Sequence, residues 1–283
     1  MVEFVNDPNF KDLVVDTTID NRNDEEPMTI RNFTELMIQF YKLGWMRGSG
    51  GAMGCISGSE LMISPSALQK ERIREQDVFV YNMKDKTEVQ RPPNKRITVS
   101  SCSVLFSLIM KETGSECVIH THSKCANLIT QLIKSNVFEI SHQEYIKGIY
   151  DPFSGKALKY SDTLTIPIID NMPSESQLLV CAINRSPMQP DCFINIALFQ
   201  EPIRGVLENY PQAIAVLVRN HGLFVWGPTW ESTKIMTECI DYLLELSIEM
   251  LKNNIPLVNE EAFEKEDNLS DKMRTLMFGD MAP

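Results

Sequence analysis

Two histidines separated by a single residue are the strongest chemical feature of this sequence. His120 and His122 follow a short apolar run, 117–119, that suits a buried strand. Because alternate side chains of a strand project from the same face, both imidazoles are expected to point the same way. Imidazole pairs suit zinc. The spacing therefore predicts part of a metal site, although a histidine considered alone is more often bonded to backbone inside a core.

A catalytic zinc usually has three protein ligands and one open position, so a third ligand must come from elsewhere in the chain. His221 is the first candidate, because it follows another buried-strand run at 213–218 and stands where that strand is expected to end. His142 is the only other histidine and remains the spare candidate. Three imidazoles remote along the chain would have to meet for the metal prediction to hold.

Helices and strands alternate along the chain, which is typical of a single α/β domain. Apolar residues recur at helical spacing after residue 30, and Gly44 is a plausible helix stop. Thr98 and Thr229 are expected to cap helices, and Pro167 predicts an edge strand. The expected helices are 30–43, 100–111, 124–133 and 229–252, and the expected strands are 60–63, 77–82, 117–122, 138–140, 164–168, 213–218 and 222–226.

Composition narrows the class of protein. The net charge of −11 opposes binding to nucleic acid or to an anionic membrane. Seven cysteines, an odd number with irregular spacing, argue against a secreted disulfide framework. No apolar run is long enough to span a bilayer, and the acidic N-terminus has no signal pattern. We therefore expect a cytoplasmic protein that acts on a small molecule.

A glycine-rich stretch, 48–51, offers a second kind of site. Its backbone amides, beside the hydroxyl of Ser49, can form a nest for an anion such as phosphate. Taken alone the signal is weak, because most glycine-rich stretches are only turns. Residues 52–58 are small and are expected to be irregular.

These motifs together resemble the class II aldolase/adducin family, and within it a dehydratase branch that acts on a sugar phosphate in methionine salvage. The likeness covers most of 28–255. His120 and His122 with a distant His221-Gly222 are specific for the family, whereas His142-Gln143-Glu144 followed by Ile146-Lys147-Gly148 points to the dehydratase branch. The remaining matching pieces are Gly44-Trp45, 48–51, Ser64-Pro65-Ser66, 69–73, Cys102 and Val225-Trp226-Gly227.

The resemblance implies a single three-layer α/β/α domain around a largely antiparallel sheet, assembled as a homo-tetramer. It implies one Zn²⁺ per subunit held by His120, His122 and His221, a general acid/base at Glu144, and a lyase that removes water from its substrate. The residues expected to contact the substrate or its phosphate are Cys102, Ser49, Gly50, Ser66 and Lys147.

The sequence also departs from the family pattern. Ala52–Cys55 adds residues after the glycines, and Ala67 stands where the family has glycine. Residues 180–200 form an atypical insertion, which we interpret as a retained intron. We expect 1–26 to be a polar lead-in, 27–256 the catalytic domain and 257–283 an acidic tail. Two alternatives stay open: another zinc-dependent aldolase or epimerase of the family, or a non-catalytic, adducin-like or inactive isoform.

Overall fold

A single mixed sheet organises the chain. The computed structural model describes residues 27–172 and 201–258. Within these ranges nine strands lie in the order β4-β3-β2-β1-β5-β9-β8-β7-β6, and every neighbouring pair is antiparallel except β7 with β8. The strands are β1 (Ala52–Ser57), β2 (Glu60–Ile63), β3 (Phe79–Asn82), β4 (Glu88–Gln90), β5 (Cys117–Thr121), β6 (Val137–Ser141), β7 (Thr163–Ile169), β8 (Ala215–Val218) and β9 (Gly222–Gly227). The expected α/β fold with a largely antiparallel sheet is confirmed.

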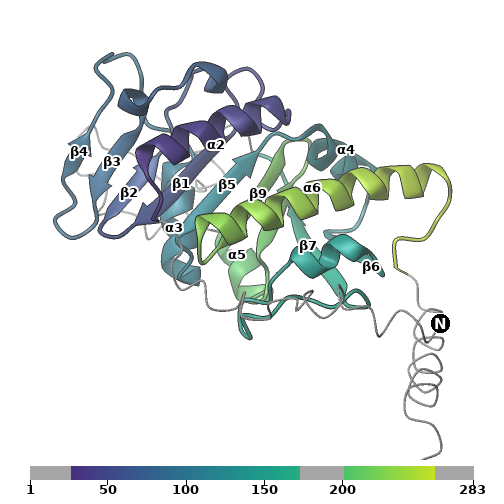
Figure 1. The fold of residues 1–283 in the computed structure, drawn as a ribbon. Helices are drawn as coiled ribbons and strands as arrows, with labels where there is room; N and C mark the ends of the chain where they lie inside the picture. Colours follow the sequence, from purple (N-terminus) through teal and green to yellow (C-terminus); the bar gives the residue numbers. More distant parts are fainter. Residues whose placement is uncertain (1–26, 173–200, 259–283) are drawn as a thin grey trace, which may run out of the picture.

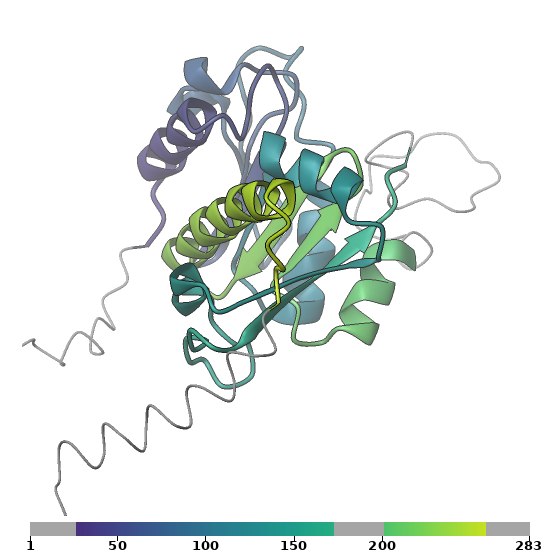
Figure 2. The same cartoon turned by 90° about the vertical axis from the view of Figure 1, so that its right-hand side faces the viewer.

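Helices cover both faces of this sheet. One face carries α2 (Ile30–Lys42), α4 (Lys124–Leu132) and the long α6 (Trp230–Lys252), whereas α3 (Ser103–Thr113) and α5 (Glu201–Asn209) lie behind it (Figures 1 and 2). Short 3₁₀ helices complete the connections: η3 (Lys70–Arg72), η4 (Glu75–Asp77) and η5 (Glu144–Gly148). None of the helices in the described ranges combines the length and apolarity needed to cross a bilayer.

Strand β5 is buried along its whole length because it lies near the middle of the sheet with a helical layer on each face. Its alternating side chains enter different cores: Val118 packs with the cluster around α3, and Ile119 with the cluster around α2. A strand that is buried on both faces reads as a continuous apolar run, which is why 117–119 was recognisable from sequence.

Three local expectations were wrong. Residues 52–57 form the interior strand β1, paired with β2 and β5, rather than irregular chain. Helix α3 starts at Ser103 with Cys102 at its cap position, so Thr98 caps nothing there. Strand β7 is not an edge strand; its pairing with β8 covers only Ile168 and Ile169, so the missing N–H of Pro167 breaks no bond of that ladder.

The pairing also fixes two ends of the sheet. Strands β5, β7 and β8 finish where β9 begins, so Thr121, Ile169, Val218 and Gly222 share one end, named here the ligand end. Strand β6 runs antiparallel to β7, so Ser141 lies beside Thr163 at the other end, named here the far end. At about 3.3 Å per residue, β7 separates the two ends by about 20 Å.

Candidate metal centre

Three imidazole rings converge at the ligand end of the sheet. The Nε2 atom of His122 lies 3.0 Å from that of His120 and 2.9 Å from that of His221. The candidate ligand atoms of all three lie within 4.8 Å of one another. Zinc with bonds of about 2.0–2.1 Å at tetrahedral angles would separate its nitrogen ligands by about 3.3 Å. The three rings therefore need only a small adjustment to bind one ion.

The outer nitrogens of two rings are held by oxygen acceptors. His120 donates its Nδ1–H to the carbonyl oxygen of Leu223, at 3.1 Å, and His221 donates its Nδ1–H to Oδ1 of Asn171, at 3.2 Å. A hydrogen bond at Nδ1 fixes the tautomer that leaves the Nε2 lone pair available to a metal. Both of these nitrogens face Nε2 of His122, so the three could bind one cation once His122 also presents its Nε2 lone pair. The donor set fits a divalent metal such as zinc.

The two candidate ligands at the end of β5 are placed by packing and by a backbone hydrogen bond. The His120 ring is fully buried and stacks on Phe224 with centroids 3.9 Å apart. His122 follows the last residue of β5, and its backbone N–H donates to the carbonyl oxygen of Trp45 at 2.7 Å. A Cβ at Gly50 would lie 2.5 Å from Nδ1 of His122, so only glycine lets this loop lie against the ring.

An aspartate on α6 supports the same segment, and sequence reasoning missed it. Asp241 accepts a hydrogen bond from Nε1 of Trp45 at 2.7 Å through one oxygen, and a short one from the hydroxyl of Ser123 through the other. Ser123 also caps α4, which begins directly after it. Asp241 thus joins the two residues that flank His122 in space. It lies 118 residues from Ser123, so no local pattern could have indicated this pairing.

Three of the five residues expected at the substrate lie in two loops that a buried lysine joins. Gly50 packs on His122 as described, and Ser49 and Ser66 belong to the neighbouring loops. Lys70, which is fully buried, donates from Nζ to the carbonyl oxygens of Ser49, Pro65 and Leu68 at 3.1–3.2 Å. Lys70 stands in a charged run, 69–72, of the kind that is usually solvated, yet its side chain is buried and joins the two loops.

Cys102 is buried beside the start of α3. Its backbone N–H bonds to the hydroxyl of Ser100, and its side chain belongs to the same apolar cluster as Phe224, the ring that stacks on His120. Only 2% of its surface is exposed, so this chain alone offers a substrate little access to the Cys102 thiol.

Glu144 and Lys147 lie elsewhere. Both belong to η5, which follows β6 at the far end of the sheet, and their side chains form an ion pair at 2.9 Å. The Glu144 side chain is 70% exposed. Helix α6 crosses the sheet with α4 packed along one side and η5 along the other (Figure 1). One copy of the chain therefore does not bring Glu144 to its own three histidines.

His142 is also remote from the centre. It lies at the far end with a left-handed backbone, φ 56°, and its Nδ1 bonds to the hydroxyl of Ser141 at 3.0 Å. Its ring meets Tyr160 edge-on. The spare candidate thus has a structural setting of its own, and His221 is the histidine that joins the pair.

Cys117 and Cys125 each lie three residues from a candidate ligand, and neither sulfur joins the cluster of three histidines among the described residues. Burial, together with the carboxylates of Asp241 and Glu245, raises the pKa of the Cys125 thiol to about 11. Burial likewise raises the pKa of Cys117 at the start of β5. Metals bind thiolate, so a raised pKa disfavours these sulfurs as ligands.

The comparisons with known proteins agree with this geometry. The family model described as the class II aldolase and adducin N-terminal domain matches residues 31–248. The chain belongs to this family.

Relatives define the branch of the family more narrowly. The chain is 93% identical over 283 residues, all of both chains, to a probable methylthioribulose-1-phosphate dehydratase of Caenorhabditis elegans. It is 40% identical over 218 residues to the methylthioribulose-1-phosphate dehydratase of Homo sapiens, a match covering 77% of this chain and 81% of the relative. Because the nematode match runs the whole length, the insertion at 180–200 is not a peculiarity of this chain; its structure lies outside the described residues.

A solved structure shows the same fold. An L-fuculose 1-phosphate aldolase aligns with a TM-score of 0.56 at 13% identity, over 88% of this chain and 99% of that one. This likeness supports the three-layer architecture and says nothing further about the substrate of this chain.

Proposed function

We propose that this chain is a lyase that dehydrates 5-methylthioribulose 1-phosphate to 2,3-diketo-5-methylthiopentyl 1-phosphate in methionine salvage. The observation that carries the proposal is the meeting of three Nε2 atoms in a chain 93% identical to the nematode relative. The free thiols at Cys55, Cys102, Cys117, Cys125 and Cys239 are compatible with the reducing cytoplasm, where we place the reaction.

We propose one Zn²⁺ per subunit, held by His120, His122 and His221. Bound zinc supplies a Lewis acid that polarises the substrate carbonyl at C2 and stabilises negative charge on oxygen during proton removal. The imidazoles contribute neutral nitrogen ligands, and the acceptors at Nδ1 keep two of the rings in the tautomer that binds. Gly50 leaves room beside the His122 ring for the loop, and with it the substrate, to approach.

The elimination needs a proton carrier, and Glu144 is our candidate. The C3–H bond and the C4–O bond break, the proton and the hydroxyl group leave as water, and the resulting enol becomes the C3 ketone. A carboxylate can take the C3 proton and deliver a proton to the departing hydroxyl. Because Glu144 lies at the far end of its own sheet, it must serve the metal centre of a second copy.

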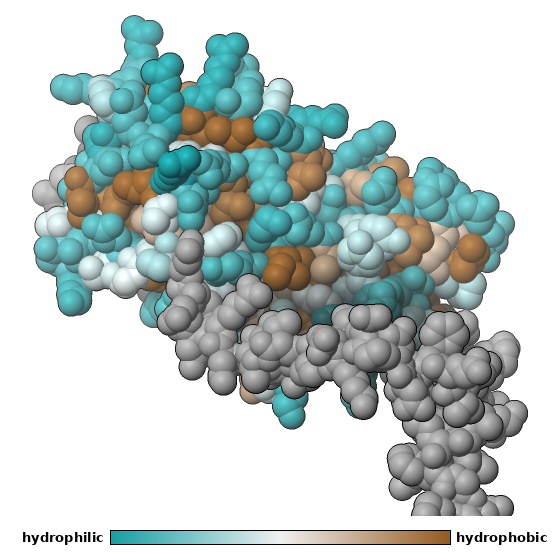
Figure 3. All heavy atoms as spheres, viewed as in Figure 1, coloured by the Kyte–Doolittle hydropathy of each residue, from teal (hydrophilic) through white to brown (hydrophobic). Residues whose placement is uncertain are grey.

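The surface around Glu144 suits such an assembly. Tyr145 and Tyr242 stack with centroids 4.0 Å apart beside Ile235, and each of these three side chains is at least 43% exposed. The face that carries α6 shows brown apolar patches among hydrophilic surface in Figure 3. Burial of exposed aromatic side chains is a common source of interface stability. We propose a homo-tetramer in which each η5 helix reaches a neighbouring copy.

The phosphate is assigned to the two loops that Lys70 joins. Ser49 and Ser66 offer hydroxyl groups in these loops, and Gly50 packs against His122, whereas the backbone N–H groups of Gly50 and Ser66 already donate to the carbonyl oxygens of Arg47 and Thr98. Lys147 would enter with Glu144 from the second copy, and its ammonium would add a positive charge. Cys102 is proposed to contact the substrate from the floor of the site.

Mixing two inactive variants tests the shared site. Glu144→Gln and His122→Ala are each expected to lose on the order of 10²-fold or more in turnover of methylthioribulose 1-phosphate. Hybrid oligomers of the two contain some centres with an intact triad and an intact Glu144, so diketone formation should recover on mixing. Hybrids that form, as judged by native mass spectrometry, but remain inactive would exclude a glutamate shared between copies.

A second candidate, a zinc-dependent aldolase, is favoured by one observation. Glu71 has a buried carboxylate oxygen, Oε2, without a hydrogen-bond partner among the described residues. Such an oxygen is free to accept a proton, and Glu71 is next to Lys70 beside the proposed phosphate loops. Cleavage of a sugar phosphate into two smaller carbonyl compounds that is abolished in Glu71→Gln and retained in Glu144→Gln would favour the aldolase.

A further inference from the structure

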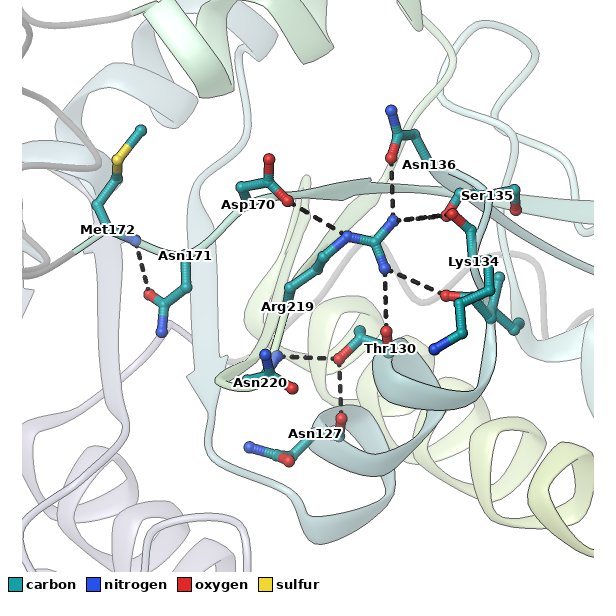
Figure 4. A network of polar contacts seen from close by, with 11 residues as sticks. Asn127, Thr130, Lys134, Ser135, Asn136, Asp170, Asn171, Met172, Arg219 and Asn220 are labelled. Atoms are coloured by element: carbon teal, nitrogen blue, oxygen red, sulfur yellow. Dashed lines mark hydrogen bonds and ion pairs between the residues drawn. The ribbon is translucent and has the colours of Figure 1, made fainter.

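The guanidinium of Arg219, two residues before His221, lies among several oxygen acceptors. Its Nη1 donates to the carbonyl oxygens of Thr130 and Ile133 at 3.0 and 3.1 Å, and its Nη2 donates to Ser135 O and Asn136 Oδ1 at 2.8 and 2.9 Å. The Nε atom pairs with Asp170 Oδ1 at 3.3 Å. Figure 4 shows the guanidinium surrounded by these acceptors.

These contacts supply hydrogen-bond donors to carbonyl groups at the C-terminal end of helix α4. Helix α4 ends at Leu132, and the last carbonyl groups of a helix have no partner within it. A cation at this position also interacts favourably with the helix dipole. Arginine presents five N–H donors in a rigid planar fork, so one side chain can bond several carbonyl groups that a lysine could not reach together.

The same residue lies in the turn that carries His221. Strands β8 and β9 are joined by 219–221, in which Asn220 has a left-handed backbone, φ 55°. The backbone N–H of Asn220 donates to Oγ1 of Thr130 at 3.0 Å, so the turn is attached to α4 at two adjacent residues (Figure 4). Backbone bonds hold the turn to the sheet, from Arg219 N–H to Ile169 O at 2.9 Å and from His221 N–H to Val218 O at 3.1 Å, and the bonds to α4 add a side-chain support to them.

Arg219 also contacts the segment after β7 that contains the hydrogen-bond acceptor of His221. Its ion pair is with Asp170, and the next residue, Asn171, accepts the Nδ1–H of His221. A single side chain therefore joins the end of α4, the segment after β7 and the turn between β8 and β9. Helix α4 begins immediately after His122 and Ser123, and its last turn contacts Arg219 and Asn220, the two residues that precede His221.

We propose that Arg219 is a positioning residue of the metal centre, which fixes His221 relative to His122 through α4 and Asn171. The proposal rests on the metal site proposed above and extends it to a side chain that touches neither metal nor substrate. Removal of an outer contact that orients a metal ligand typically weakens metal binding by about 10- to 100-fold. Loss of Arg219 should therefore weaken metal binding.

The test measures zinc affinity of the full chain by competition with a chromogenic chelator. Arg219→Met is expected to bind zinc about 10- to 100-fold more weakly than the unaltered chain. Arg219→Lys keeps the charge but loses the planar fork, so its zinc affinity should lie between that of the unaltered chain and that of Arg219→Met. Arg204→Met is the matched control: this arginine pairs with Glu112 at 3.4 Å on the α3–α5 face, and its removal should leave zinc affinity unchanged.

A second readout separates positioning from general stabilisation. A residue that only stabilises the fold lowers the unfolding temperature of the metal-free and zinc-loaded forms equally. A positioning residue also reduces the rise in unfolding temperature that zinc produces, because that rise depends on affinity. In the cobalt-substituted protein, Arg219→Met should also alter the visible d–d absorption bands, which report ligand geometry.

The outcomes are distinct. If the unaltered chain binds neither zinc nor cobalt, the proposed metal function fails. If it binds both, and Arg219→Met binds zinc equally tightly with an unchanged cobalt spectrum, the role of Arg219 is refuted. Should Arg219→Met not fold, Arg219→Lys and Asn136→Ala give the same comparison, with smaller losses expected; unchanged affinity in both would also refute it.

Discussion

The three candidate ligands are held in two different ways. His120 lies on a buried strand, and His122 directly follows it; both owe their places to the pairing of β5 and to packing against Phe224 and Gly50. His221 lies on a turn, where polar contacts orient it. The comparison teaches that converging imidazoles can be positioned in two ways, by packing at the end of a buried strand or by hydrogen bonds to neighbouring segments.

The largest effect is expected when a strand ligand is removed. His120→Ala deletes a metal ligand and the ring that stacks on Phe224, so both zinc binding and packing should suffer. Turnover is expected to fall on the order of 10²-fold or more. Zinc content and steady-state rates measure this, and Phe224→Leu, which keeps all three ligands, is the control for packing alone.

Breaking the support behind His122 should have the next largest effect. Asp241→Leu removes the acceptor shared by Trp45 and Ser123, and zinc affinity should fall by about 10-fold or more. Asp241→Asn keeps an acceptor for Trp45 and can donate to the Ser123 hydroxyl, so its affinity should stay within about threefold. Chelator competition distinguishes them. Equal losses in both variants would show that charge, not bonding geometry, matters at this position.

A methyl group at Gly50 tests the contact of the glycine loop with the same ring. Because the new Cβ would lie 2.5 Å from Nδ1 of His122, Gly50→Ala must displace the loop or the imidazole. We expect zinc affinity to fall by up to about 10-fold, as for other disturbed outer contacts. Gly205→Ala on α5, where an added Cβ meets nothing within 4 Å, should leave affinity unchanged. Unchanged zinc affinity in Gly50→Ala would show that the loop can move away from the His122 ring without disturbing the site.

The smallest effect concerns a thiol beside this support. Burial comes first, and the Asp241 carboxylate second, among the causes that raise the pKa of Cys125 to about 11. Removing the negative charge in Asp241→Asn lowers this pKa, so more thiolate is present at pH 9 and alkylation should be faster by a few-fold. Mass spectrometry of the Cys125 peptide after timed iodoacetamide treatment gives the rate. A slower reaction would contradict the sign of this effect.

Much of the strand-borne half of the site could be predicted from sequence. The alternation of His120 and His122 after an apolar run is a local pattern. It is easy to recognise because a strand buried on both faces has a continuous apolar sequence. His221 was reached through its place at the end of another apolar run. The family resemblance then supplied the fold, which the sheet order and the family match bear out.

The supports of the ligands could not be predicted, because they join residues far apart in the chain. Lys70 read as a surface charge, yet three carbonyl oxygens from two loops surround it. Arg219 and Asp241 read as ordinary charged residues beside helical or strand patterns. Residues 52–57 looked irregular because small side chains hide strand periodicity, although they pair on both sides. Tertiary partners, absent from any local window, determine all of these.

The central claim is that His120, His122 and His221 together bind one metal ion, and zinc stoichiometry tests it most directly. Elemental analysis of the full-length protein after extensive dialysis should give one zinc per chain, and the His221→Ala protein, handled in parallel, should retain almost none. A His221→Ala protein that keeps a full equivalent of zinc would contradict the account, because the turn-borne imidazole would then play no part in holding the ion.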